Sequence, residues 1–149
     1  MNKLVIANVG KSCQGKSTAI KEVLLYLLKN GAKELEKVRI GSFEEDIKTI
    51  VTYQGAKIGI ESQGDPNSRI FKSLPDFVNK KCDIIICACR TYGETHEEVL
   101  ELSHDGYQVL FFSNPRFEEN YYPNAFLNLN KEYAKMVKNI IDKRIAGKL

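Results

Sequence analysis

Residues 4–17 read LVIANVGKSCQGKS, and this stretch decides the fold that the sequence predicts. Its first half, residues 4–9, is a mostly apolar run with the length of a buried strand. Its second half, residues 10–17, has the spacing G-x-x-x-x-G-K-[ST]. Apolar residues at helical spacing follow from Lys16 to Asn30. The sequence therefore predicts a strand, a glycine loop and a helix in direct succession.

The spacing of residues 10–17 suits the binding of phosphate groups. Glycines let the loop curl so that successive backbone N–H groups point inwards, and the following helix N-terminus adds its own donors and dipole. In such a loop Lys16 reaches the β- and γ-phosphates of a nucleoside triphosphate, and Ser17 holds Mg²⁺. The nucleotide-binding residues that this pattern indicates are Gly10, Lys11, Ser12, Cys13, Gln14, Gly15, Lys16, Ser17 and Thr18.

Length and composition set the limits of the remaining chain. The 149 residues fit one domain, residues 1–149, and 43% hydrophobic with 28% charged residues is typical of a globular protein. No apolar run approaches the length of a membrane span, and the start of the chain leads directly into the first strand, so we expect a cytoplasmic protein. The net charge of +3 is spread along the chain, which argues against a dedicated nucleic-acid surface. The cysteines, at 13, 82, 87 and 89, are expected to be reduced and mostly buried.

Strand and helix patterns alternate after the first helix. We expect strands at 38–43, 47–53, 56–61, 83–89 and 107–112, and helices at 66–81, 96–103 and 131–148. Gln54-Gly55 predicts a tight antiparallel hairpin, Pro75 predicts a kink or a break in its helix, and residues 113–130 are expected to be irregular. This order predicts an α/β protein with a three-layer αβα fold, whose mostly parallel sheet includes one antiparallel hairpin strand.

Acidic residues near the predicted strand ends are candidates for the metal site. A triphosphate bound with Mg²⁺ needs a carboxylate at the end of a neighbouring strand. Glu61 follows an apolar strand at such a place, and Asp65 comes four residues later, so both are candidate metal ligands beside Ser17 and candidate catalytic residues beside Lys16. Two alternatives stay open: Glu61 as a glutamate at the solvent rim, and Asp65 as the N-cap of the next helix.

Further charged residues lie on the same side of the predicted sheet. The acidic run 44–46 follows the second expected strand, where it forms either a solvated loop or part of an acceptor or switch site. Arg69, Arg90 and Arg116 each lie near a predicted loop or helix start. Each of them either stabilises charge on the γ-phosphate or forms an ordinary surface salt bridge.

With its Walker A motif at 10–17, and in the order of its elements, the chain resembles P-loop NTPases. The segment that ends in Glu61-Ser62-Gln63-Gly64 resembles the one before the D-x-x-G switch of small GTPases, with glutamate in place of the aspartate. Asn114 matches the asparagine of their guanine-reading N-K-x-D sequence, but residues 115–117 do not supply its aspartate. The resemblance therefore implies ATP in preference to GTP, with Mg²⁺, and Asn114 as a nucleotide-binding residue.

Two other partial resemblances imply different uses of the nucleotide. Lys11 stands where the deviant Walker A loop of ParA/MinD-like ATPases carries a lysine that reaches the phosphates of a partner subunit. The size of the chain and its opening strand, loop and helix are also similar to those of small P-loop kinases. The leading hypothesis is an ATP-binding NTPase that hydrolyses slowly and acts as a switch or assembly factor on a protein partner or a homodimer. The alternatives are a small-molecule or nucleotide kinase and a binding module without turnover.

Overall fold

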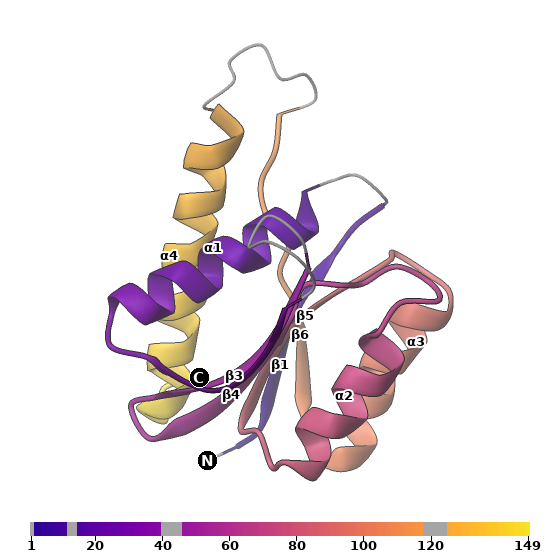
Figure 1. Cartoon of the computed structure of the whole chain (residues 1–149), viewed down its shortest axis with the longest axis horizontal. Coiled ribbons are helices and arrows are strands. Elements are labelled where there is room, and N and C mark those ends of the chain that lie inside the picture. The colour runs from indigo at the N-terminus through magenta and orange to yellow at the C-terminus, as the bar shows by residue number, and fades with distance from the viewer. Residues whose placement is uncertain (1, 12–14, 40–45, 118–124) are drawn as a thin grey trace.

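The computed structural model describes residues 2–11, 15–39, 46–117 and 125–149 (Figure 1). Within these residues six strands form one mixed sheet, accompanied by four α-helices and one 3₁₀ helix. In chain order the elements are β1 (Leu4–Val9), α1 (Lys16–Lys29), β2 (Lys33–Arg39), β3 (Ile47–Tyr53), β4 (Ala56–Glu61), α2 (Ile70–Asn79), β5 (Ile84–Cys89), α3 (Glu94–Glu101), η1 (Leu102–Asp105), β6 (Gln108–Phe111) and α4 (Ala125–Ile145).

The strands lie in the order β2-β3-β4-β5-β1-β6. β1 is parallel to both of its neighbours, β5 and β6, and β4 is parallel to β5. β3 is antiparallel to β2 and to β4, so in the described sheet it is the one antiparallel strand that the sequence predicted. The prediction of an α/β protein is confirmed. Because β1 lies in the parallel part, the residues that follow it reach the carboxyl edge of the sheet, where ligands bind in open α/β folds.

The predicted hairpin is present between β3 and β4. Its two turn residues, Gln54 and Gly55, have φ angles of 48° and 80°. Two consecutive residues in the left-handed region match the twist of an antiparallel pair, and glycine adopts that region at little cost. The turn sets a register in which Tyr53 pairs with Ala56 and Lys48 with Glu61, so the start of β3 lies beside the end of β4.

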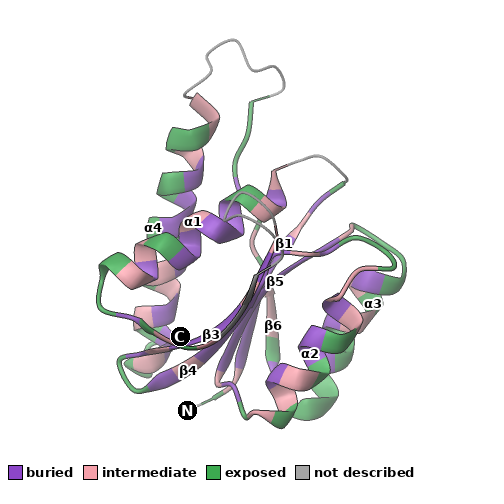
Figure 2. Ribbon diagram, in the orientation of Figure 1, coloured by how far each residue is buried: buried purple, intermediate pink, exposed green. Residues whose placement is uncertain are grey.

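Helices cover both faces of the sheet (Figures 1 and 2). Alternate residues of β1 divide between two buried clusters: Leu4 and Ile6 pack with α1 and α4, whereas Val5 and Ala7 pack with α2 and α3. A strand that is buried on both faces reads as a continuous apolar run, as β1 and β5 do. The two faces matter for the site because neighbouring residues at a strand end point to opposite sides of the sheet.

Three expectations about the elements need correction. β2 spans 33–39, whereas the sequence predicted a strand at 38–43; residues 40–43 lie outside the described residues. β2 is an edge strand rich in charged residues, so a search for apolar runs does not detect it. α2 continues past Pro75, so of the kink or break that the sequence predicted the break is wrong. Within 113–130, expected to be irregular, α4 already begins at Ala125. In the described part of the chain, no helix combines the length and the apolar character of a membrane span.

Candidate functional site

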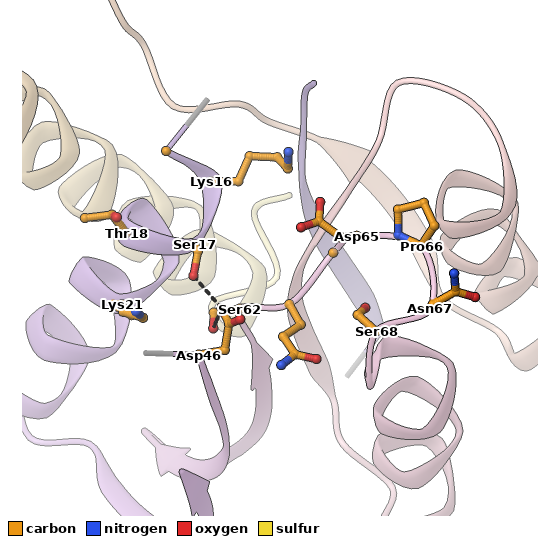
Figure 3. Close-up of a pocket in the computed structure, with 13 residues that line it drawn as sticks. Lys16, Ser17, Thr18, Lys21, Asp46, Ser62, Asp65, Pro66, Asn67 and Ser68 are labelled. Atoms are coloured by element: carbon orange, nitrogen blue, oxygen red, sulfur yellow. Dashed lines mark hydrogen bonds between the residues drawn. The ribbon is translucent and has the colours of Figure 1, made fainter. Parts of the chain in front are cut away.

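A cavity of about 590 Å³ opens at the carboxyl edge of the sheet, between the start of α1 and the segment that follows β4 (Figure 3). Its lining is predominantly polar, with hydroxyl, carboxylate, amide and ammonium groups from three parts of the chain. The residues are Gly15, Lys16, Ser17, Thr18, Lys21, Asp46, Ser62, Gln63, Gly64, Asp65, Pro66, Asn67 and Ser68.

Lys16 is the first residue of α1, and only 7% of its surface is exposed. Its ammonium donates hydrogen bonds to the carbonyl oxygens of Gly10, at 2.9 Å, and Lys11, at 2.6 Å. The first turn of α1 carries no acidic residue, and no side chain caps it. The N–H groups at a helix start lack partners within the helix and favour anions. A nearly buried cation and an uncapped helix start therefore face the same cavity.

Ser17, the next residue, connects α1 with two strands of the sheet. Its hydroxyl donates to Asp46 Oδ1 at 2.6 Å, and the Ser62 hydroxyl donates to the same oxygen at 2.9 Å (Figure 3). Ser62 Oγ in turn accepts from the backbone N–H of Ile47 at 2.8 Å. One carboxylate oxygen thus joins the start of α1, the start of β3 and the end of β4.

The sequence interpretation missed Asp46, because it lies in the acidic run 44–46 and was grouped with that loop. The predicted hairpin between residues 47–53 and 56–61 could have indicated the position of Asp46. β3 is antiparallel to β4, so the residue just before β3 lies beside the residue just after β4, which is Ser62. Glu44 and Glu45 lie outside the described residues.

Glu61 lies on the other face of the sheet from Ser17. Ile60 and Ile58 pack with α1, so Glu61 points towards α2, where it is fully buried. Its carboxylate accepts from Arg69 at 2.6 Å (Nε) and 2.8 Å (Nη2) and from the Ser73 hydroxyl at 2.6 Å. These hydrogen bonds raise the pKa of Arg69. The alternative of a solvent-rim glutamate is wrong, and the geometry favours a structural ion pair over the expected metal role.

Asp65 lines the cavity from the opposite wall. Its carboxylate accepts from Arg90 Nε at 2.9 Å, and its side chain is 64% exposed. It does not cap the next helix, because α2 begins at Ile70 and Arg69 occupies the N-cap position. Arg69 and Arg90 are therefore both engaged in ion pairs, whereas Arg116 is exposed.

Asn114, expected to contact the nucleotide, is buried after β6. Its Oδ1 accepts from Asn8 Nδ2 at 2.9 Å, and the preceding Ser113 hydroxyl donates to the carbonyl of Val9. These contacts hold the residues after β6 against the end of β1, directly before Gly10. On α4, the fully buried Asn130 finds no hydrogen-bond partner among the described residues for the nitrogen or the oxygen of its side-chain amide. Buried amides of this kind are commonly satisfied by internal water.

Two glycines are required by close contacts around the cavity. Gly15 has φ +75°, and a Cβ there would lie 2.0 Å from Cζ of Phe126, so the start of α4 packs directly against Gly15. A Cβ on Gly64 would lie 2.5 Å from the backbone carbonyl of Ala88 on β5. The glycine therefore lets the cavity wall approach the sheet closely, as the sequence pattern alone did not indicate.

The remaining predicted site residues and the cysteines are placed as follows. Lys11 is exposed, and Thr18 is an exposed residue of the cavity lining. Ser12, Cys13 and Gln14 lie outside the described residues. The other cysteines, Cys82, Cys87 and Cys89, are buried free thiols, as predicted. Burial raises the pKa of Cys82 and of Cys89 to about 11.

Comparison of the chain with protein-family models and with curated proteins gives no match. The functional argument therefore depends on the motif and on the geometry of the cavity.

Proposed function

We propose that the chain is a P-loop NTPase with a three-layer αβα fold, and that it binds ATP with Mg²⁺ in the cavity between α1 and residues 62–68. The observation that carries this proposal is the meeting of Lys16, Ser17 and Asp46 in one cavity at the end of β1. The G-x-x-x-x-G-K-[ST] spacing supports it independently.

Lys16 and the start of α1 would hold the phosphates. In the structure the Lys16 ammonium donates hydrogen bonds to the backbone carbonyls of Gly10 and Lys11, so it is already directed towards the residues that follow β1. A phosphate group offers the ammonium an ionised acceptor in place of neutral carbonyls, so an attraction between opposite charges replaces a contact between a charge and a dipole. The uncapped N–H groups of the first turn add donors without further charge.

The donor set at Ser17 and Asp46 fits Mg²⁺. The hydroxyl and the carboxylate are hard oxygen ligands, and they come from elements that the Ser17–Asp46 hydrogen bond already brings together. In the described residues no group of three or more His, Cys, Asp or Glu side chains forms a metal cage. Mg²⁺ takes few protein ligands beside phosphates and water, and it neutralises charge on the phosphates when bound.

The proposal favours ATP over GTP. Asn114, the single match to the guanine-reading sequence, has its side chain engaged by Asn8. The aspartate that would accept hydrogen bonds from guanine is replaced by Phe117, which is exposed. Without a carboxylate there, guanine has no preferred acceptor.

The engagement of two carboxylates in ion pairs supports slow hydrolysis. Glu61 is held by Arg69 and Asp65 by Arg90, so neither is poised as a base for an attacking water. We propose that the nucleotide state controls a protein partner or a homodimer. The second candidate is a kinase, favoured by the extension of the cavity past Ser17 to Asn67 and Ser68, which leaves polar space beyond the phosphates.

The test is titration of the protein with ATP and GTP, each with and without Mg²⁺, followed by turnover measurements with and without a panel of acceptors. The proposal expects tighter binding of ATP, a requirement for Mg²⁺, and slow acceptor-independent release of phosphate. Turnover that requires an acceptor would favour the kinase, and binding without any turnover would leave only a nucleotide-binding module. No binding of either nucleotide would refute the proposal.

A further inference from the structure

A second polar cavity, of about 400 Å³, lies at the other edge of the sheet. It is formed where three elements meet: the residues before β1, the residues before β6 and the last turn of α4. Because β1 and β6 are parallel, the starts of both strands lie at the amino edge, away from the phosphate loop (Figure 1). The lining residues are Asn2, Lys3, Gly106, Gln108 and Arg144.

Arg144 is the unusual residue of this cavity, because only 5% of its surface is exposed. Its guanidinium forms one hydrogen bond, from Nη2 to Oε1 of Gln108 at 2.6 Å. Within the residues that the structure describes, its buried Nε has no hydrogen-bond partner and its guanidinium forms no ion pair with a carboxylate. Arginine is almost never buried unless it is paired, since an isolated buried charge is costly. The site therefore has a positive charge that forms no ion pair among the described residues.

The neighbouring charge has the same sign. Lys3 lines the same cavity, and its ammonium donates to the backbone carbonyl of Asp105 at 3.3 Å and lies 5.2 Å from the ring centre of Tyr107. Both of these contacts are with groups that carry no formal negative charge. Two cations from opposite ends of the chain thus border one cavity.

We propose that this cavity is a binding site for a small oxyanion, a phosphate monoester or a carboxylate, held by Arg144 with the support of Lys3. The planar guanidinium presents its N–H groups in a fork that matches both kinds of anion, which accept two parallel hydrogen bonds from it. The site is separate from the nucleotide cavity and does not depend on the proposed function.

The experiment is a titration of the isotope-labelled chain with inorganic phosphate, and separately with acetate, followed by amide resonances. The amides of Gly106 and Gln108 report on this cavity, and those of Gly15 and Thr18 report on the phosphate loop. We expect saturable shifts at Gly106 and Gln108 with at least one of the two anions. Shifts with phosphate alone identify a phosphate ester as the ligand class, and shifts with acetate identify a carboxylate.

Variants assign the shifts to Arg144. Arg144→Gln should weaken binding at Gly106 and Gln108 by about tenfold or more, and it should leave the titration curves of Gly15 and Thr18 as they are in the wild type. Lys72→Gln, at an exposed cation on α2, is the control and should bind as the wild type does. If Arg144→Gln does not fold, Lys3→Gln serves in its place and should weaken the same shifts.

Two results would overturn the proposal. One is the absence of saturable shifts at Gly106 and Gln108 with both anions. The other is binding in a folded Arg144→Gln, or in Lys3→Gln where only that variant folds, as tight as in the wild type.

Discussion

Replacing Glu61 by glutamine tests whether this residue belongs to the fold or to the metal. The carboxylate is fully buried and accepts two hydrogen bonds from Arg69, one from the Ser73 hydroxyl and one from the backbone N–H of Gln63. Glu61→Gln removes the charge and turns an amide N–H₂ towards donors. Arg69 is then left without its counterion in a largely buried place.

The expected cost follows from this geometry. Removing one partner of a buried ion pair typically costs about 3 to 5 kcal/mol, because the other charge stays buried and unpaired. Arg69 keeps 16% of its side chain exposed, which favours the lower end, about 3 kcal/mol. In a chain of this length 1 kcal/mol shifts the midpoint of thermal unfolding by roughly 2 to 4 °C. We therefore expect Glu61→Gln to lower the Tm by roughly 6 to 12 °C without nucleotide.

The assay is thermal unfolding followed by far-ultraviolet circular dichroism, combined with ATP titration at several Mg²⁺ concentrations. Glu132→Gln is the matched control, since Glu132 forms only an exposed ion pair with Lys135. It should change stability by less than about 0.5 kcal/mol. Glu61→Gln should keep the Mg²⁺ dependence of the wild type. If its Tm equals that of Glu132→Gln and its Mg²⁺ dependence is lost, Glu61 serves the metal and this reasoning is refuted.

Three further outcomes are expected. Asp46→Asn should reduce the Mg²⁺ dependence of ATP binding, whereas the exposed Asp105→Asn should not; equal dependence in both variants, measured by titration, would exclude Asp46 from the metal site. Gly64→Ala should lower the free energy of unfolding by about 1 to 3 kcal/mol in denaturant titrations, because a Cβ would lie 2.5 Å from the backbone of Ala88, and an unchanged stability would contradict this contact. Burial raises the pKa of Cys82 and Cys89 from 9.0 to about 11, so between these pH values the folded state keeps thiol protons that the unfolded chain loses. The contribution of the two neutral thiols to the free energy of unfolding is therefore complete below pH 9 and is lost as the pH rises to about 11. Cys82→Ala/Cys89→Ala should flatten that decline in unfolding experiments across this range, and an equal decline would contradict the burial of neutral thiols.

Much of the fold follows from local patterns. The strand β1, the helix α1 and the hairpin between β3 and β4 are predicted because an apolar run, helical spacing and a Gln-Gly turn each act over a few residues. The position of β2 was not predicted, because an edge strand needs apolar residues on only part of its surface and so gives a weak apolar pattern. The start of α4 at Ala125 was not predicted, because Phe126 in its first turn packs against Gly15, which lies more than one hundred residues earlier in the sequence.

The part of the candidate site that comes from one continuous stretch of sequence could be predicted. Lys16 and Ser17 follow from the motif, but the partner of Ser17 depends on how two strands pair. Glu61 and Ser62 are adjacent in sequence and point to opposite faces, so a shift of one residue decides which of them lies beside α1. The sequence favoured Glu61 for the metal, whereas the hydrogen bonds connect Ser17 with Asp46 and Ser62.

The affinity of Lys16→Ala for ATP with Mg²⁺ tests the central proposal most directly. Lys16 is directed at the loop carbonyls and not into the apolar clusters, so the variant should stay folded. Loss of a charged hydrogen bond costs about 1.5 to 3 kcal/mol, which corresponds to a roughly 10- to 150-fold weaker Kd. Lys72→Ala, an exposed site on α2, is the control and should bind as the wild type does. Calorimetric titration that shows a loss of this size in Lys16→Ala alone would support the proposal, and equal affinity of a folded Lys16→Ala and the wild type would contradict it.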